Sequence, residues 1–147
     1  LVGGGRMLRA LGIDVDDQGR IYIADTWNKR IQVMIPAGDT LTYPSNITWD
    51  IDAWYGESLD NKPFLAIDKD YNSYIADPIY GRVLVFDIEG NFLRAWGGFG
   101  SSPGEIGTVG GLAVDADGSG WVSDSRNNRI MAFDLPPLPV EEQSPEE

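Results

Sequence analysis

An aspartate followed five residues later by an arginine recurs three times along this chain. Each aspartate closes a short apolar run and each arginine opens the next one: Asp25 with Arg30, Asp77 with Arg82, and Asp124 with Arg129. The copies are 52 and 47 residues apart, and the same offsets align two further sets: Asp16, Asp68 and Asp115, and Tyr22, Tyr74 and Trp121. Distinctive residues that recur at one spacing indicate a repeat architecture. The sequence therefore predicts about three copies of one structural unit.

The stretch from residue 64 to residue 98 contains one complete unit. Its apolar residues form four short runs, rich in β-branched and aromatic side chains, at 64–67, 74–76, 83–86 and 92–96. Such runs, bounded by Asp, Asn, Gly and Pro, are typical of β-strands. The connections at 68–72 and 87–91 have the composition of hairpin turns. We expect an antiparallel meander of four strands, here called a, b, c and d.

The repeated segments resemble the NHL-repeat family. The shared pattern is an apolar-x-Val-Asp run before a turn, then Tyr-Ile-Ala-Asp, then Asn-x-Arg-Ile, and it extends over roughly residues 5–134. The resemblance implies a β-propeller, an all-β fold whose blades are four-stranded antiparallel sheets. Some members of this family bind nucleic acids, and some related propellers are lyases or lactonases that hold a metal in a central channel.

The repeats divide the chain into an incomplete ring of about three blades. We expect residues 1–11 to be the crossover from a preceding blade, and blades 1, 2 and 3 to occupy residues 12–56, 57–98 and 99–134. Blade 3 lacks strand d because prolines follow it, and residues 135–147 are expected to be a disordered, acidic, proline-rich tail. A propeller needs about four to eight blades to close. The other blades lie either upstream or on another chain, or a second copy completes a six-bladed ring.

Blade 1 departs most from the repeat. A long polar connection, Pro36 to Ile47, is expected between its strands c and d, and residues 53–56 are expected to mark strand d. In blade 2, Tyr71 stands where the pattern has a turn glycine. The d strands hold or adjoin three tryptophans that are expected to pack between blades: Trp49, Trp54 and Trp96.

The composition excludes several kinds of site within these residues. The chain has no Cys and no His, so it offers no cysteine nucleophile and no histidine base or metal ligand. Its net charge of −12 argues against a nucleic-acid partner, because contacts to phosphates need clustered Lys and Arg. No stretch approaches the roughly 18 apolar residues of a membrane helix. We expect no catalytic residue, no metal site and no cofactor.

The b-to-c loops are the predicted binding surface. In a meander these loops emerge on the same face as the crossovers between blades, and repeat proteins commonly bind through varied loops on one face. An exposed Trp or Tyr beside Arg is typical of a protein-binding hot spot; packing of these side chains against neighbouring loops is the alternative. The candidate residues are Trp27, Asn28, Lys29, Ile79, Tyr80, Arg126, Asn127 and Asn128.

The repeated Asp and Arg pairs bracket these loops. Their presence in every blade favours a structural role, in which the carboxylate accepts hydrogen bonds from the loop and the guanidinium ties strands together, over binding of an anion or a sugar. The acidic turns at 14–19 and 115–118 resemble the start of a calcium loop but lack the glutamate that completes an EF-hand. Asp and Gly also suit tight turns. A structural turn is therefore favoured, with weak Ca²⁺ binding as the alternative.

These observations predict a non-catalytic protein-binding or assembly module, half of an NHL-type propeller within a larger protein or complex. The expected partners are a protein, other blades of the same propeller, or a second copy of the chain. One alternative is part of a metal-dependent lyase or lactonase whose missing blades supply the ligands. Another is a sensor domain, because NHL propellers occur outside the membrane on bacterial receptor-type kinases. The sequence leaves the compartment open, with an extracytoplasmic or membrane-associated location favoured.

Overall fold

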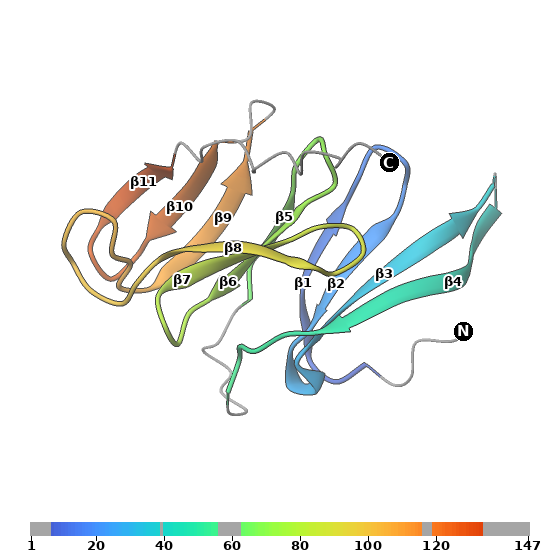
Figure 1. The fold of residues 1–147 in the computed structure, drawn as a ribbon, viewed down its shortest axis with the longest axis horizontal. Helices are drawn as coiled ribbons and strands as arrows, with labels where there is room; N and C mark the ends of the chain where they lie inside the picture. Colours follow the sequence, from blue (N-terminus) through green and yellow to red (C-terminus); the bar gives the residue numbers. More distant parts are fainter. Residues whose placement is uncertain (1–6, 39, 56–62, 116–118, 134–147) are drawn as a thin grey trace, which may run out of the picture.

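The computed structural model describes residues 7–38, 40–55, 63–115 and 119–133. These residues form three antiparallel sheets arranged side by side as a fan (Figure 1). The sheet of blade 1 contains β1 (Ala10–Val15), β2 (Ile21–Asp25), β3 (Arg30–Ala37) and β4 (Thr40–Asp50). Blade 2 contains β5 (Leu65–Ile67), β6 (Ser73–Asp77), β7 (Arg82–Phe86) and β8 (Phe92–Gly97). Blade 3 contains β9 (Val109–Val114), β10 (Gly120–Asp124) and β11 (Arg129–Phe133).

Each sheet is a meander in which consecutive strands pair, so the predicted all-β fold class is confirmed. The repeat is visible in the strand register. In all three blades the aspartate that ends the second strand lies opposite the arginine that begins the third, as in the Asp77 and Arg82 pair. The only helix among the described residues is a single 3₁₀ turn, Thr26–Asn28, and no helix in that part of the chain is long and apolar enough to cross a membrane.

The outer strand of blade 1 differs from the prediction. The expected polar connection from Pro36 to Ile47 is instead a hairpin that extends the sheet: β3 continues to Ala37, and β4 begins at Thr40. Residues 53–55, expected to mark strand d, lie beyond the end of β4. The physical reason is that β3 is longer than its counterparts, so its exposed ladder groups are satisfied by the chain that returns immediately beside it. The predictions for residues 1–6 and 135–147 lie outside the described residues.

The core consists of two layers, one in each space between neighbouring blades. The first layer packs side chains of blade 1, such as Tyr22 and Ile31, against Leu65 and Phe86 of blade 2. The second packs Tyr74 and Val83 of blade 2 against blade 3 residues that include Val109 and Val122. The residues that form these layers alternate along the strands, as expected when each sheet is covered on a face by the next blade.

The tryptophans contribute to both layers. Trp49 of β4 packs against Phe86 of blade 2, with ring centroids 6.4 Å apart, and Trp96 of β8 packs against Phe133 of blade 3 at 3.7 Å. Trp54 is buried and donates its indole N–H to the carbonyl of Ala76, at 2.9 Å. The outer strand of one blade therefore reaches across to the next blade and holds the fan together.

Candidate functional site

The three b-to-c loops share one backbone conformation. The residue that precedes each repeated arginine adopts a left-handed conformation: φ is 52° at Lys29, 61° at Gly81 and 51° at Asn128. Only Gly81 adopts it without steric cost, because the other two carry a Cβ. Gly81 thus occupies a position that all three blades hold in the same geometry, although the other two blades have Lys and Asn there.

Each loop is closed by the predicted Asp and Arg pair. The arginine Nε lies 2.8 Å from the carboxylate in the Asp25 pair, 2.9 Å in the Asp77 pair and 3.1 Å in the Asp124 pair. All three carboxylates are fully buried and the guanidinium groups are partly exposed. A buried carboxylate needs such charged and hydrogen-bonding partners to remain ionised.

The arginines also bind the segment that leads in from the preceding blade. Arg129 donates to the carbonyls of Ser101, Ser102 and Glu105, and Arg82 donates to the carbonyl of Asp52 at 3.1 Å. The guanidinium groups of Arg82 and Arg129 therefore join their own blades to the segments before them. This geometry leaves little of the Arg129 donor capacity for a ligand, because four of its N–H bonds are already directed at protein oxygens.

Backbone N–H groups satisfy the second oxygen of two of the three carboxylates. Asp25 accepts a hydrogen bond from the Leu8 N–H at 2.8 Å, and Asp124 accepts one from the Gly107 N–H at 3.0 Å. Leu8 and Gly107 are separated by the same 99 residues as the two aspartates. The crossover before blade 1 and the crossover before blade 3 are therefore built in the same way.

These partners set the ionisation of two of the aspartates. Burial acts to raise the pKa of Asp25, but the Asn28 amide, the Leu8 N–H and Arg30 outweigh it and lower the pKa below the ordinary range. At Asp124, burial is likewise outweighed by Asn127, by the N–H groups of Thr108 and Gly107, and by Arg129, so its pKa is lowered. Both carboxylates are held as anions in the folded protein.

Aromatic rings and cations alternate along the same face. The ammonium of Lys29 lies 4.4 Å from the ring centre of Tyr55, which meets Tyr80 edge to face at 6.4 Å. The guanidinium of Arg82 lies 4.9 Å from the centre of Tyr80. Further along, Arg9 lies over Trp27 at 5.0 Å and Arg126 over Phe99 at 5.3 Å. We call these eight residues the aromatic–cation face: Arg9, Trp27, Lys29, Tyr55, Tyr80, Arg82, Phe99 and Arg126.

The structure brings only some of the predicted binding residues together. Lys29 and Tyr80 meet through Tyr55, whereas Trp27 and Arg126 belong to separate contacts at blades 1 and 3. Ile79 is half-buried and Asn128 is exposed. Asn28 and Asn127 turn inward and donate to the aspartates of their own blades, at 2.8 Å and 2.7 Å. Those two amides are part of the framework of their own loops.

Three members of the face were not among the candidates: Arg9, Tyr55 and Phe99. They lie in the segments that connect the blades, where the sequence pattern does not repeat, and only the packing of neighbouring blades places them beside the loops. The signal available in the sequence was an aromatic residue in each connecting segment, Tyr55 and Phe99. Both are exposed in the structure.

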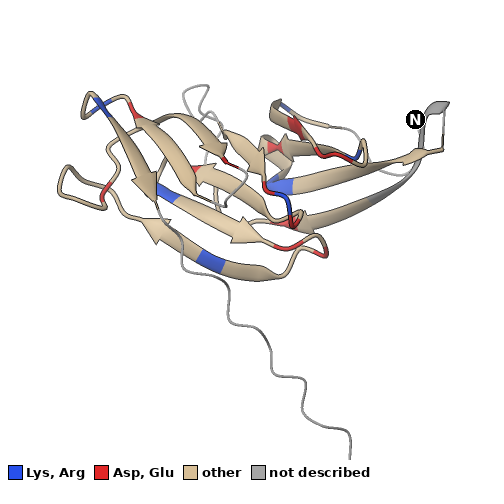
Figure 2. Cartoon of the chain, turned by 90° about the horizontal axis from the view of Figure 1, so that it is seen from above, with Lys and Arg blue, Asp and Glu red and all other residues tan. Residues whose placement is uncertain are grey.

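The acidic turns at the opposite ends of the strands are closed on themselves. Asp16 accepts from the N–H groups of Gln18 and Arg20, and Asp68 from those of Asp70 and Asn72. Figure 2 shows acidic residues concentrated in turns and at strand ends. Within the described ranges, no group of three or more acidic residues is placed to hold a metal ion. The Ca²⁺ alternative stays a prediction for the remaining turn residues.

A comparison with known protein families identifies one repeat in blade 1. Residues 7–34 match the NHL repeat. Blade 1 therefore carries an NHL repeat, and the three sheets have the fold of β-propeller blades. The matched residues run from the segment before β1 into β3 and so include the Asp25 and Arg30 pair. None of the curated protein sequences compared with the chain matches it.

Solved structures with a similar fold include two lyases. A catalytically inactive histidine-to-alanine variant of virginiamycin B lyase from Staphylococcus aureus, solved with quinupristin, matches with a TM-score of 0.61 and 14% identity, over 93% of this chain and 45% of that one. A streptogramin B lyase matches with a TM-score of 0.55 and 10% identity, over 84% of this chain and 40% of that one. The chain thus spans less than half the length of either neighbour, and at these identities the likeness concerns the fold.

Proposed function

We propose that this chain is a non-catalytic protein-binding or assembly module that forms about half of an NHL-type propeller in a larger protein or complex. The observation that carries the proposal is the aromatic–cation face. Tyr80 is 50% exposed and Tyr55 is 43% exposed, yet Lys29 and Arg82 hold both rings in place. Rigid, exposed aromatic side chains beside cations lose little conformational entropy on binding and are enriched in hot spots.

The charge distribution supports a partner that carries carboxylates. The chain as a whole is acidic, with a net charge of −12, but the cations of the aromatic–cation face lie where the repeated aspartates are buried and already paired. The negative charges of the turn side would repel an acidic partner, whereas the cations of the loop side would attract it. Electrostatics would therefore orient the partner toward the loop side.

The test is affinity capture with matched variants. The immobilised chain is exposed to extract from its source cells, and captured proteins are quantified by mass spectrometry against a Trp27→Ala/Tyr80→Ala variant and against Glu89→Ala, a control on the opposite turn side. We expect specific partners to be lost with the double variant and kept with the control. Identical capture by all three proteins, with unchanged circular dichroism, would contradict the proposal.

A second candidate is part of a propeller lyase, which the two lyase neighbours favour. Replacement of a histidine inactivates the first of those enzymes, and the present chain contains no histidine. This stretch would therefore need other blades to supply such a group. Consumption of quinupristin by a protein that holds this chain together with its other blades would support the lyase, whereas a protein that leaves quinupristin unchanged and captures a partner through the aromatic–cation face supports the binding module.

A further inference from the structure

The outer face of blade 3 carries apolar side chains typical of a protein interior, but these side chains are exposed to solvent. Trp121 is 45% exposed and Ile130 is 75% exposed. The residues at the same repeat positions in the other blades are fully or almost fully buried beneath the next blade: Tyr22, Tyr74, Ile31 and Val83. The face thus presents side chains that the other two blades cover, and no described residue covers it here.

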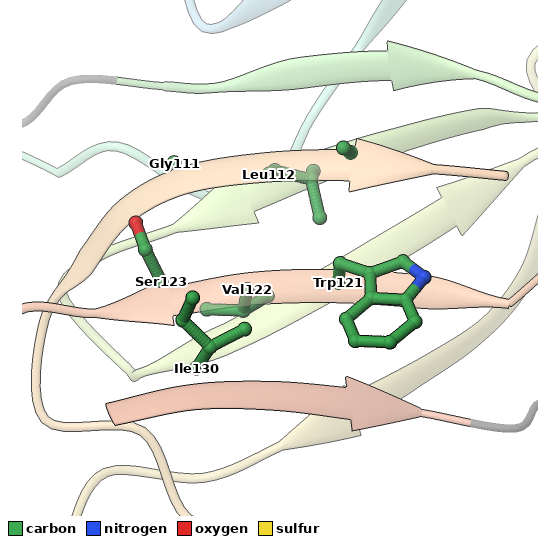
Figure 3. A pocket seen from close by; sticks show the side chains of 7 residues that line it. Gly111, Leu112, Trp121, Val122, Ser123 and Ile130 are labelled. Carbon is green, nitrogen blue, oxygen red and sulfur yellow. The ribbon is translucent and has the colours of Figure 1, made fainter.

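A hollow of about 310 Å³ lies in this face, between Trp121 and Ile130 (Figure 3). Its floor is made of small residues, Gly111 and Ser123. A Cβ at Gly111 would meet only the Ser123 hydroxyl, at 3.1 Å, among the described atoms within 4 Å. The hollow therefore has room for one aliphatic side chain from another sheet.

The contact between blades 1 and 2 shows what fills the equivalent hollow. Gly12 is the counterpart of Gly111, and Ala24 is the counterpart of Ser123. A Cβ at Gly12 would lie 2.3 Å from the carbonyl oxygen of Pro63 and 3.5 Å from the Cβ of Leu65. In that interface the first strand of the next blade, β5, crosses the glycine and places Leu65 above it.

The other end of the fan carries the matching side chain. Ile13 occupies in blade 1 the repeat position that Leu65 occupies in blade 2, and it is 68% exposed. Val15, the counterpart of Ile67, is 54% exposed on the same face of β1. The outer face of blade 1 therefore presents side chains of the kind that the hollow in blade 3 can accommodate.

We infer that a second copy of this chain docks on blade 3, with Ile13 of its β1 entering the hollow between Trp121 and Ile130. A two-fold axis repeats the contact at the other end, so both open faces are buried and the ring closes with six blades. Two copies together have about the length of one of the lyase neighbours, of which a single copy covers 45%. The inference does not rest on the loop face, and its failure would leave the proposed binding function intact.

Light scattering behind a sizing column, over a concentration series, measures the mass directly. We expect twice the 16.1 kDa of the chain. Ile13→Asp and Gly111→Leu should each raise the dissociation constant of the dimer by at least about tenfold, by inserting a charge into the interface or by filling the hollow. Phe92→Asp, at an exposed site on the outer strand of blade 2, should leave the dimer unchanged.

A measurement on the separated chains distinguishes docking from misfolding. A Cβ at Gly111 meets only the Ser123 hydroxyl among the described atoms of its own chain, so Gly111→Leu should keep the circular dichroism spectrum of the wild type. The loss of the dimer would then come from collision with the docked β1, as a Cβ at Gly12 would collide with the carbonyl oxygen of Pro63. A wild-type chain that stays at 16.1 kDa up to high concentration, or single variants that dimerise as well as the wild type, would overturn the inference. Either result would mean that another segment or another protein, and not a second copy of this chain, packs on the outer face of blade 3.

Discussion

The indole of Trp96 stacks on the ring of Phe133, with centroids 3.7 Å apart, and the same relationship recurs 47 residues earlier between Trp49 and Phe86. In both cases the outer strand of one blade covers the third strand of the next. Trp49 also lies under Gly90, at which any Cβ would come within 2.7 Å of the indole. The contact between blades is therefore a repeated unit in its own right.

Replacing the first of these tryptophans tests that contact. Trp49 is buried between two blades, so Trp49→Ala should lower the free energy of unfolding by about 3–5 kcal/mol, through lost burial and the cavity left behind. Urea denaturation followed by circular dichroism measures the change. Phe92→Ala, at an exposed position, is the control and should cost far less. Equal losses in the two variants would mean that the indole contributes little to the interface.

Gly90 provides an independent test of the same packing. Its φ is +87°, and a Cβ would collide with the indole of Trp49. Gly90→Ala should therefore destabilise the protein by about 1–3 kcal/mol, from backbone strain and the displaced ring. Gly104 also has a positive φ, of 85°, but a Cβ there meets nothing within 4 Å. A larger loss at Gly104 than at Gly90 in thermal unfolding would argue against the clash.

The Asp and Arg pairs are expected to stabilise the fold. Arg82→Ala removes the partner of the fully buried Asp77 and the bond to the Asp52 carbonyl, and should cost about 1–3 kcal/mol. Arg9→Ala removes a cation that only covers Trp27 and is the matched control. An unchanged melting temperature for the Arg82 variant, measured by calorimetry, would count against the structural role.

Stability should fall as the solution becomes acidic. The folded-state pKa values of Asp25 and Asp124 are lowered, so their contribution is complete above the unfolded-state value of about 3.9 and is lost as the pH falls through the native values. Asp124→Asn should be less stable than the wild type at neutral pH but should lose less stability as the pH falls below about 4. Urea midpoints at several pH values measure this slope, and parallel curves for the two proteins would contradict it.

Alkaline solution should act on Tyr74. Burial, with the neighbouring Asp68 carboxylate, raises the pKa of Tyr74 to about 12. A raised folded-state pKa contributes stability that is complete below about pH 10, the unfolded-state value, and is lost as the pH rises toward the folded-state value. Tyr74→Phe should remove one late step from the tyrosinate absorbance titration and flatten the alkaline loss of stability. A first ionisation of this residue near pH 10 would show that it is accessible in the folded state.

Much of the fold could be predicted because its signals are local. Strand positions in blade 2 follow from alternating apolar residues between turns, and the repeat itself follows from Asp, Arg and aromatic residues at fixed offsets. Blade 1 was harder. Pro44 interrupts the alternation between residues 40 and 50, and proline within a run argues against a strand. It is tolerated because β4 is the outer strand of its sheet, where one ladder edge has no partner in the described residues.

The aromatic–cation face shows the same division. Trp27, Lys29, Tyr80 and Arg126 could be predicted to lie on one side because the b-to-c loops of a meander emerge together, and their role in binding stays a prediction. Tyr55 and Phe99 could not be predicted in this way, since their segments follow no repeat. The order of residues along the chain was enough to establish the blades, their pairs of Asp and Arg, and the absence of histidine and cysteine chemistry. Which rings meet which cations, and which apolar faces remain open at blades 1 and 3, depended on how the sheets stack, because those contacts join residues that no local pattern relates.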